Sequence, residues 1–238
     1  MRGWFWAAAV AACGVIGGAA QAADVTPAAG YQWSGFYLGA SAGYGFGDTD
    51  YRYFPPDFTA APDAAADEPP VGISYDGGML GGQLGYNYQA GSLVLGIEAD
   101  VSASAIRGDR STTDAPPCFE DGCSAEIDWF GTGRLRLGYA MNDVMPFVTG
   151  GAALVGYHGD ADKGACGYDG SCGYDDTAWG WTVGGGVEWG FAARWSAKAE
   201  YLYVNVDAPA FSGPGGRQVR AGDLDFSTLR IGVDYHLD

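Results

Sequence analysis

The sequence predicts an all-β protein, an eight-stranded antiparallel transmembrane β-barrel with short turns at one end and four long loops at the other. Three observations predict this fold: eight segments in which apolar and polar residues alternate, connections that alternate between short and long, and aromatic residues gathered near the segment ends. Alternation with a period of two is typical of a β-strand that has one apolar face. A chain of 238 residues suits one such domain.

The alternating segments span residues 33–46, 75–89, 92–105, 125–139, 144–158, 177–190, 194–206 and 223–237. The third is the clearest, because Leu93, Leu95 and Ile97 fall on one face. Glu98 and Asp100 fall on the other face of the same segment. Strands of soluble proteins average about five or six residues, whereas a tilted membrane crossing needs about 9–11 residues. The length of the segments therefore favours a membrane barrel.

Short and long connections alternate along the chain. Tight turns are predicted at 90–91, 141–143 and 192–193, and long loops at 47–74, 106–124, 159–176 and 207–222. The long connections are rich in Pro, Asp, Ala, Gly and Ser, as loops usually are. All four long loops then emerge at one end of the barrel, which is the pattern of outer-membrane barrels with short periplasmic turns and long extracellular loops. A soluble barrel, with the apolar faces turned inward, is the alternative.

Aromatic residues near the strand ends predict two rings at the height of the membrane interfaces, where Trp and Tyr are enriched. The residues assigned to these rings are Trp33, Trp129, Tyr139, Trp179, Trp181, Trp189, Trp195, Tyr201, Tyr203 and Tyr235.

The N-terminus predicts export. A positive start at Met1-Arg2, an apolar run over 3–20 and the small-x-small sequence Ala20-Gln21-Ala22 are typical of a secretory signal peptide. We therefore divide the chain into a cleaved signal peptide (1–22), a short N-terminal segment (23–32) and an outer-membrane barrel (33–238). The sequence Val10-Ala11-Ala12-Cys13 also resembles a lipid-attachment box, but the apolar run continues past it.

One of the five cysteines lies in the predicted signal peptide. The other four are Cys118, Cys123, Cys166 and Cys172, an even number that indicates disulfides in an oxidising compartment. Three connectivities are possible, and the spacing favours the local pairs Cys118–Cys123 and Cys166–Cys172. A zinc site is the alternative, but these spacings with only His158 nearby make a poor metal framework.

The formal net charge of −17 argues against nucleic acid as a partner, since nucleic-acid binding needs a basic face. Catalysis is not expected, because only His158 and His236 are present and no serine has the context of an activated nucleophile. The glycine runs at 43–47 and 184–186 open no helix, so they are strand glycines and not phosphate loops. No enzyme, cofactor or metal site is predicted. The acids of the long loops indicate solvated surface, or alternatively weak Ca²⁺ or Mg²⁺ bridging to lipopolysaccharide.

The stretch WSGFYLGASAGYGF at 33–46 holds four glycines, although glycine weakens a strand. In lipid a closed barrel pairs every backbone N–H and C=O between strands, and an unpaired group would cost several kcal/mol. An eight-stranded barrel also has a narrow interior. We expect Gly39, Ser41 and Gly43 to face that interior, where the glycines make room. The lipid-facing residues of this stretch are then Phe36, Leu38, Ala40 and Tyr44.

The polar strand faces carry both signs of charge, which predicts a network of ion pairs that plugs the lumen. The alternative is a selective channel with charged rings. The residues assigned to the network are Glu98, Asp100, Asp128, Arg134, Arg136, Glu188, Lys198, Glu200, Arg230 and Asp234, with Gln83 and Asn87 beside them.

The segment WSGFYLGASAGYGFG at 33–47 resembles the opening strand of the small outer-membrane β-barrels of Gram-negative bacteria, the outer-membrane immunogenic protein or opacity-type porin-like family. GGMLGGQLGYNYQAGSLVLGIEAD at 77–100 and RLRLGYAMNDVMPFVTGGAA at 134–153 resemble the second and middle hairpins of that family. The resemblance implies a structural, surface-antigenic or porin-like outer-membrane barrel. It also implies contact with outer-membrane lipid and lipopolysaccharide, and insertion by the barrel-assembly machinery. We expect a structural role in envelope integrity, with a narrow solute channel and surface adhesion as the alternatives.

Members of this family usually end in an assembly signal that reads polar-x-Gly-x-x-aromatic-x-hydrophobic. Arg230, Gly232, Tyr235 and Leu237 fit it. This chain has Leu where a terminal Phe is common, and Asp238 follows as one extra residue.

Overall fold

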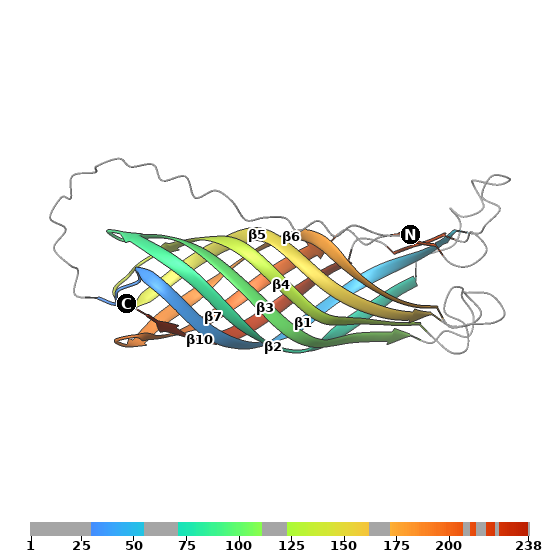
Figure 1. The fold of residues 1–238 in the computed structure, drawn as a ribbon, viewed down its shortest axis with the longest axis horizontal. Coiled ribbons are helices and arrows are strands. Elements are labelled where there is room, and N and C mark those ends of the chain that lie inside the picture. The colour runs from blue at the N-terminus through green and yellow to red at the C-terminus, as the bar shows by residue number, and fades with distance from the viewer. Residues whose placement is uncertain are drawn as a thin grey trace, which may run out of the picture.

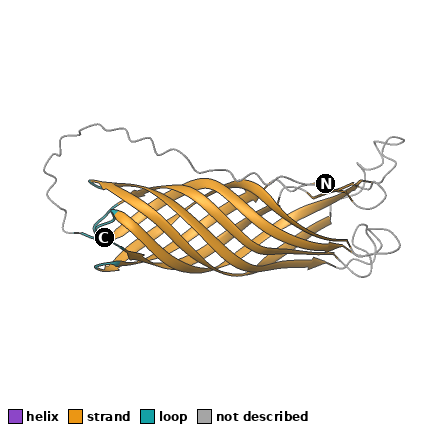
Figure 2. Ribbon diagram, in the orientation of Figure 1, coloured by secondary structure: helices purple, strands orange, loops and turns teal. Residues whose placement is uncertain are grey.

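Eight strands close into one antiparallel barrel in the computed structural model (Figures 1 and 2). The structure describes residues 30–54, 71–110, 123–161, 172–206, 210–212, 218–221 and 224–237. Neighbouring strands follow the order β10-β7-β6-β5-β4-β3-β2-β1, and β10 also pairs with β1, which closes the barrel. The predicted fold class is therefore confirmed. Among the described residues, no helix is long and apolar enough to cross a membrane.

The barrel strands are β1 (Gly35–Phe54), β2 (Val71–Ala90), β3 (Leu93–Arg110), β4 (Cys123–Tyr139), β5 (Val144–Ala161), β6 (Cys172–Ala192), β7 (Trp195–Val206) and β10 (Leu224–His236). Between β7 and β10, the short strands β8 (Ala210–Ser212) and β9 (Gln218–Ala221) form a hairpin. β9 pairs with Tyr51–Phe54, the part of β1 that extends beyond its pairing with β10.

The three short turns lie at 91–92, 142–143 and 193–194, at the end of the barrel where the C-terminus lies (Figure 1). Gly91 has a φ of 64° and Asn142 a φ of 57°, the left-handed backbone that tight turns need and that Gly and Asn tolerate best. The predicted turn positions agree with these to within one or two residues. At this end of the barrel the turns fix where each strand begins or ends.

The strand boundaries at the opposite end were predicted wrongly. β1 continues to Phe54 instead of ending at residue 46, and β6 begins at Cys172 instead of 177. The predicted loop at 207–222 contains β8 and β9. Beyond the membrane a strand needs no apolar face, so the pattern that marks strands in lipid fades while the backbone pairing continues.

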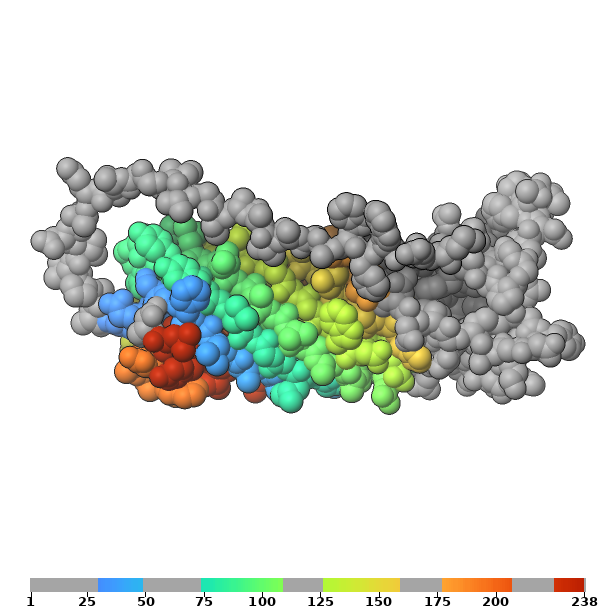
Figure 3. Space-filling view, viewed as in Figure 1, coloured from blue at the N-terminus to red at the C-terminus, as the bar shows by residue number. Residues whose placement is uncertain are grey.

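The outer wall of the barrel is a belt of exposed apolar side chains, which no other part of the described chain covers. Figure 3 shows one side of this wall, formed by β2, β3 and β4. The exposed aliphatic residues include Leu38, Leu80, Leu84, Leu95, Ile97, Val101, Leu135, Leu137, Val148, Val183, Val187, Leu229, Ile231 and Val233. Soluble proteins rarely expose so large a contiguous apolar surface.

Aromatic rings border the apolar belt at both ends. Exposed aromatic residues at the short-turn end include Tyr88, Tyr139, Trp189, Phe191 and Trp195, and those at the other end include Tyr44, Trp129, Trp179, Trp181 and Tyr201. Trp179 and Trp189 both lie on β6, ten residues apart. That separation is about 33 Å along the strand and about 25 Å along the barrel axis at a tilt of about 40°, the height of a membrane barrel's apolar band.

Trp33 is the exception among the predicted ring residues. Its side chain is fully buried inside the short-turn end of the barrel, so its assignment to an interface ring is wrong. The residue precedes β1, and the chain there turns into the barrel mouth instead of continuing along the outer wall.

Candidate functional site: the interior of the barrel

The interior holds three layers of side chains. An apolar layer fills the end with the long connections, a polar layer fills the middle, and a small apolar cluster closes the short-turn end. The polar layer contains nine of the ten residues that the sequence assigns to the lumen network, each at most 7% exposed. They are Glu98, Asp100, Arg134, Arg136, Glu188, Lys198, Glu200, Arg230 and Asp234.

Arg134 is the centre of the polar layer. Its guanidinium donates to Glu98, to Asp100 at 3.1 Å and to Glu200 at 2.6 Å, so one cation binds carboxylates from β3 and β7. Arg230 on β10 donates to the same Asp100 at 2.8 Å and to the same Glu200 at 2.5 Å. The two arginines and two of these carboxylates thus form a closed ring across the lumen.

Lys198 extends this ring toward the short-turn end. Its ammonium group donates to Glu98 at 2.7 Å and lies 4.0 Å from Asp234. The hydroxyl of Tyr37 also donates to Glu98, at 2.6 Å, and the amide of Gln83 donates to Asp234 at 2.5 Å. Charge-assisted hydrogen bonds of this kind are stronger than neutral ones, and buried charges are tolerated only when paired in this way.

Arg136 and Glu188 form a separate buried pair on β4 and β6. The Arg136 guanidinium also stacks on the ring of Phe147, 3.8 Å from its centroid, an arrangement that stabilises a cation on an aromatic face. Five buried carboxylates face four buried lysine and arginine side chains in the described interior, so the network is close to neutral.

Ser196, His236 and Glu188 meet at the short-turn end of the polar layer. Ser196 Oγ lies 3.2 Å from His236 Nε2 and donates to Glu188 at 2.5 Å. A hydrolase triad places its carboxylate on the imidazole nitrogen that faces away from the serine. Here the carboxylate accepts the serine proton itself and lies 3.7 Å from Nε2, the same nitrogen. The three side chains are at most 3% exposed, so this cluster offers no accessible nucleophile.

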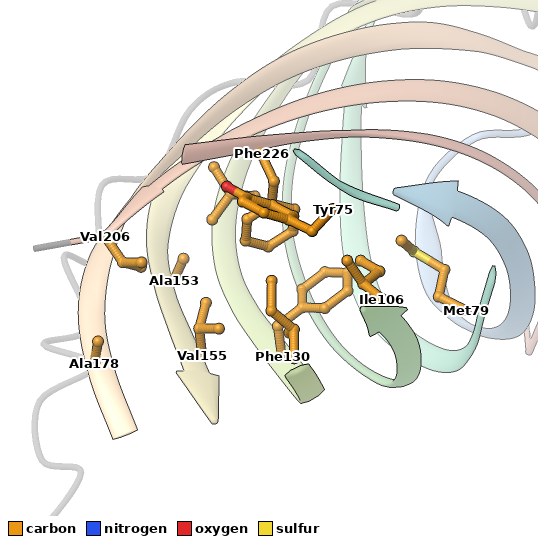
Figure 4. Packing of buried hydrophobic residues seen from close by; sticks show 11 residues of the cluster. Tyr75, Met79, Ile106, Phe130, Ala153, Val155, Ala178, Val206 and Phe226 are labelled. Carbon is orange, nitrogen blue, oxygen red and sulfur yellow. The ribbon is translucent and has the colours of Figure 1, made fainter. Parts of the chain in front are cut away.

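The apolar layer lies on the loop side of the charges, and Figure 4 shows its side chains inside the barrel. Its centre is the edge-to-face pair Phe130 and Phe226, whose ring centroids are 5.5 Å apart. Around this pair lie Tyr75, Met79, Ile106, Ile127, Ala153, Val155, Ala178, Val204 and Val206. The alternating sequence pattern predicts a polar lumen throughout, so this layer is a feature that it does not indicate.

The small cluster at the short-turn end contains Trp33, Val94 and Met145, with Tyr31 and Ala140 packed against it. Burial raises the pKa of the Tyr31 phenol to about 12, and the negative charge of Glu188 is the second cause of this rise. The phenol is therefore neutral at neutral pH and brings no charge into the barrel mouth.

The glycines of the opening stretch make room for these layers. A methyl group at Gly39 would overlap the carboxylate of Asp234, and one at Gly43 would lie 2.5 Å from the Leu229 carbonyl oxygen and 2.9 Å from Arg230 Cγ. On the outer face, Leu38 is 51% and Tyr44 49% exposed. Both glycines therefore sit where only a hydrogen atom fits beside the polar network.

Asp128 was assigned to the lumen wrongly. A β-bulge between Ile127 and Trp129 inserts it as an extra residue in the pairing with β5, so Asp128 is exposed. The bulge also puts Ile127 inside and Trp129 outside, although strict alternation places them on one face.

The remaining predicted residues lie as follows. Of the assembly-signal residues on β10 and just after it, Arg230 and Gly232 point inward. Tyr235 packs on Trp195 with centroids 5.0 Å apart, and the Leu237 amide donates to the Phe36 carbonyl at 2.9 Å. Cys123 and Cys172 begin β4 and β6, whereas Cys118, Cys166 and the predicted signal peptide lie outside the described residues. Within the described ranges, no three His, Cys, Asp or Glu side chains gather as a metal site.

Comparison with known proteins agrees with this architecture. Residues 8–236 match the family described as outer membrane protein beta-barrel domain. The 31 kDa outer-membrane immunogenic protein of Brucella melitensis is 30% identical over 97% of this chain and 94% of its own length. The 22 kDa outer membrane protein of Rhizobium leguminosarum is 30% identical over 91% of this chain and 83% of its own. Neither name denotes an enzyme.

A solved structure, the outer membrane protein OprG from Pseudomonas aeruginosa, superposes with a TM-score of 0.54. It shares 14% sequence identity and covers 86% of this chain and 97% of its own, so the likeness is one of fold. The exposed apolar belt, the two aromatic rings and the family match have one explanation. This chain belongs to the outer-membrane β-barrel protein family, and its barrel lies in the bacterial outer membrane.

Proposed function

We propose that this protein is a structural barrel of the outer membrane, which supports envelope integrity and carries surface loops without conducting solutes. The observation that carries the proposal is the filled interior. The ring formed by Arg134, Arg230, Asp100 and Glu200 spans the lumen, and an apolar layer around Phe130 covers it on the loop side.

Two barriers oppose ion passage in such an interior. Separating the paired charges to admit water leaves buried ions without partners, which costs several kcal/mol for each ion. The apolar layer excludes water by dewetting, as hydrophobic constrictions in channels do. A narrow porin-like channel is therefore the less favoured function.

Surface recognition is a second candidate, supported by the length of the strands. Cys172 lies seven residues before Trp179, which belongs to the aromatic ring at the end with the long connections. β6 therefore continues for about 23 Å along its own axis beyond that ring. β1 and β2 are paired as far as Tyr51 and Val71, also beyond the apolar belt. The Brucella relatives are named immunogenic proteins, which fits a protein whose loops reach the surface.

Several partners belong to this proposal. The apolar belt would contact membrane lipid and lipopolysaccharide. The barrel-assembly machinery would recognise the signal that runs from Arg230 on β10 to Leu237 just after it. The acidic charge of the chain argues against nucleic acid.

Complementation separates the structural role from recognition. A bacterium that lacks the gene is tested for sensitivity to detergent, then supplied with the full chain or with a barrel in which residues 55–70 and 162–171 are replaced by short turns. Both versions restore resistance if the barrel acts structurally. Restoration by the full chain alone would refute the structural role and favour recognition by the loops.

A swelling assay tests the channel alternative. Purified protein is inserted into liposomes loaded with an impermeant polymer, which are then diluted into isotonic glycine or arabinose. The filled lumen predicts no swelling beyond that of empty liposomes, with a general porin as the positive control. Swelling with either solute would make the protein a channel.

A further inference from the structure

Residues 30–34, here called the strap, cross the short-turn mouth of the barrel before β1 begins. Gly30 lies against Asn142 in the turn between β4 and β5. A Cβ atom on Gly30 would lie only 3.0 Å from the Asn142 Cα. Tyr31 packs beside Gly190 of β6 so closely that a methyl group there would overlap its ring. Trp33 is buried in one cluster with Val94 and Met145.

The strap then turns sharply into β1. Gly35 has a φ of 122°, a backbone conformation that side chains rarely allow, and this bend redirects the chain from the mouth into the wall. Hydrogen bonds with one partner, Gln89, hold the two residues that precede the bend. The Trp33 amide donates to the Gln89 side chain at 3.1 Å, and the Gln89 amide donates to Ser34 Oγ at 3.0 Å.

The strap also packs on the seam between the first and last strands. Tyr31 meets the ring of His236 edge-on at 5.3 Å, and Trp33 meets it at 6.4 Å. His236 pairs with Tyr37 at the start of the β1–β10 ladder. Residues before the first strand therefore hold the last residue of the last strand from inside the barrel.

This seam differs from every other junction in the barrel. All other neighbouring barrel strands follow each other along the chain, whereas β1 and β10 come from opposite ends. Their pairing closes the longest loop of chain, so it carries the largest closure entropy. The strap ties the start of β1 to Met145 on β5 and Gly190 on β6. These two strands lie across the barrel from β1 and from its neighbour β2.

We propose that the strap is a latch, which seats once β10 has closed on β1 and then selectively slows the opening of that seam. Its seat is built from β3, β5, β6 and β10 together, so it is complete only in the closed barrel. This role concerns assembly and persistence of the barrel, and it is independent of what the surface loops do.

Hydrogen exchange of the mature chain, folded in detergent micelles, tests the latch. Gly190→Ala removes the seat of Tyr31 without altering the strap or the seam. Gly133→Ala is the matched control, because a methyl group there meets no atom within 4 Å. We expect Gly190→Ala to speed exchange of the β1–β10 amides about tenfold, with β3–β4 amides and the control unchanged.

Trp33→Ala is the second variant, and we expect it to speed exchange at the seam about 100-fold. Faster exchange at the seam alone, in either variant, supports the latch. Equal acceleration at the β1–β10 and β3–β4 pairs would show that the strap is ordinary core packing. No acceleration in either variant would show that the strap is dispensable. Both of these results overturn the proposal.

Discussion

Arg134→Met is expected to lower the free energy of unfolding by about 3–5 kcal/mol, the cost of breaking a buried ion pair from one side. The Arg134 side chain is fully buried and contacts Glu98, Asp100 and Glu200. Methionine keeps much of the volume but leaves these carboxylates with fewer donors.

The size of this loss in unfolding free energy depends on the cation partners that each carboxylate keeps. A hydrogen bond to a charged group contributes about 1.5–3 kcal/mol, so three independent bonds would contribute about 4.5–9 kcal/mol, mostly above the expected range. Glu98 retains Lys198, and both Asp100 and Glu200 retain Arg230, so each carboxylate keeps one cation. The remaining cost is that of an unbalanced negative charge in the interior.

Urea unfolding in lipid vesicles, followed by tryptophan fluorescence, measures this change. Arg107→Met is the matched control, because Arg107 pairs with Glu126 at 3.3 Å while its side chain is 66% exposed. An exposed pair of this kind contributes less than about 1 kcal/mol. Adding Glu98→Gln to Arg134→Met should recover part of the loss, because it removes one unbalanced charge. Equal, small losses for Arg134→Met and Arg107→Met would refute the reasoning and indicate a water-filled lumen.

Three further predictions follow from the packing. Gly39→Val should abolish the compact, heat-modifiable gel band, because the side chain overlaps the interior carboxylate beside it, whereas Gly82→Val, with its nearest atom 3.8 Å away, should keep the band. Phe130→Ala should cost about 3–5 kcal/mol in the same urea assay, and a change below 1 kcal/mol would contradict the packed apolar layer. A non-reduced digest should contain no peptide with a Cys123–Cys172 disulfide. The two residues pair with β5 from opposite sides, so their Cα atoms are about 9–10 Å apart, whereas a disulfide spans at most about 7 Å between Cα atoms. Finding that peptide would contradict the strand register.

The barrel could be predicted because lipid imposes a strict pattern on its strands. Each outward residue must be apolar, so parity alone places Arg134, Arg136 and Lys198 inside. Tyr37 lies on the same face as Gly39, so the same parity identifies it as an interior residue. The partners of these side chains could not be predicted, because they depend on the register between strands distant in sequence.

The errors arise where the pattern has a local exception. A bulge adds one residue without changing composition, so nothing in the sequence around Asp128 marks the shift in parity. Trp33 has the character of an interface aromatic, yet it precedes the strand and enters the mouth. Phe130 and Phe226 are apolar on an inward face, which the rule of a polar lumen excludes.

Single-molecule conductance in a planar lipid bilayer tests the central claim, that the lumen is filled, most directly. The purified protein is inserted from detergent, its folding checked by its shifted gel mobility, and a large-pore porin serves as the positive control. The paired charges and the apolar layer predict a silent bilayer in molar salt. Discrete, reproducible current steps from the folded barrel would contradict the filled interior and make this protein a channel.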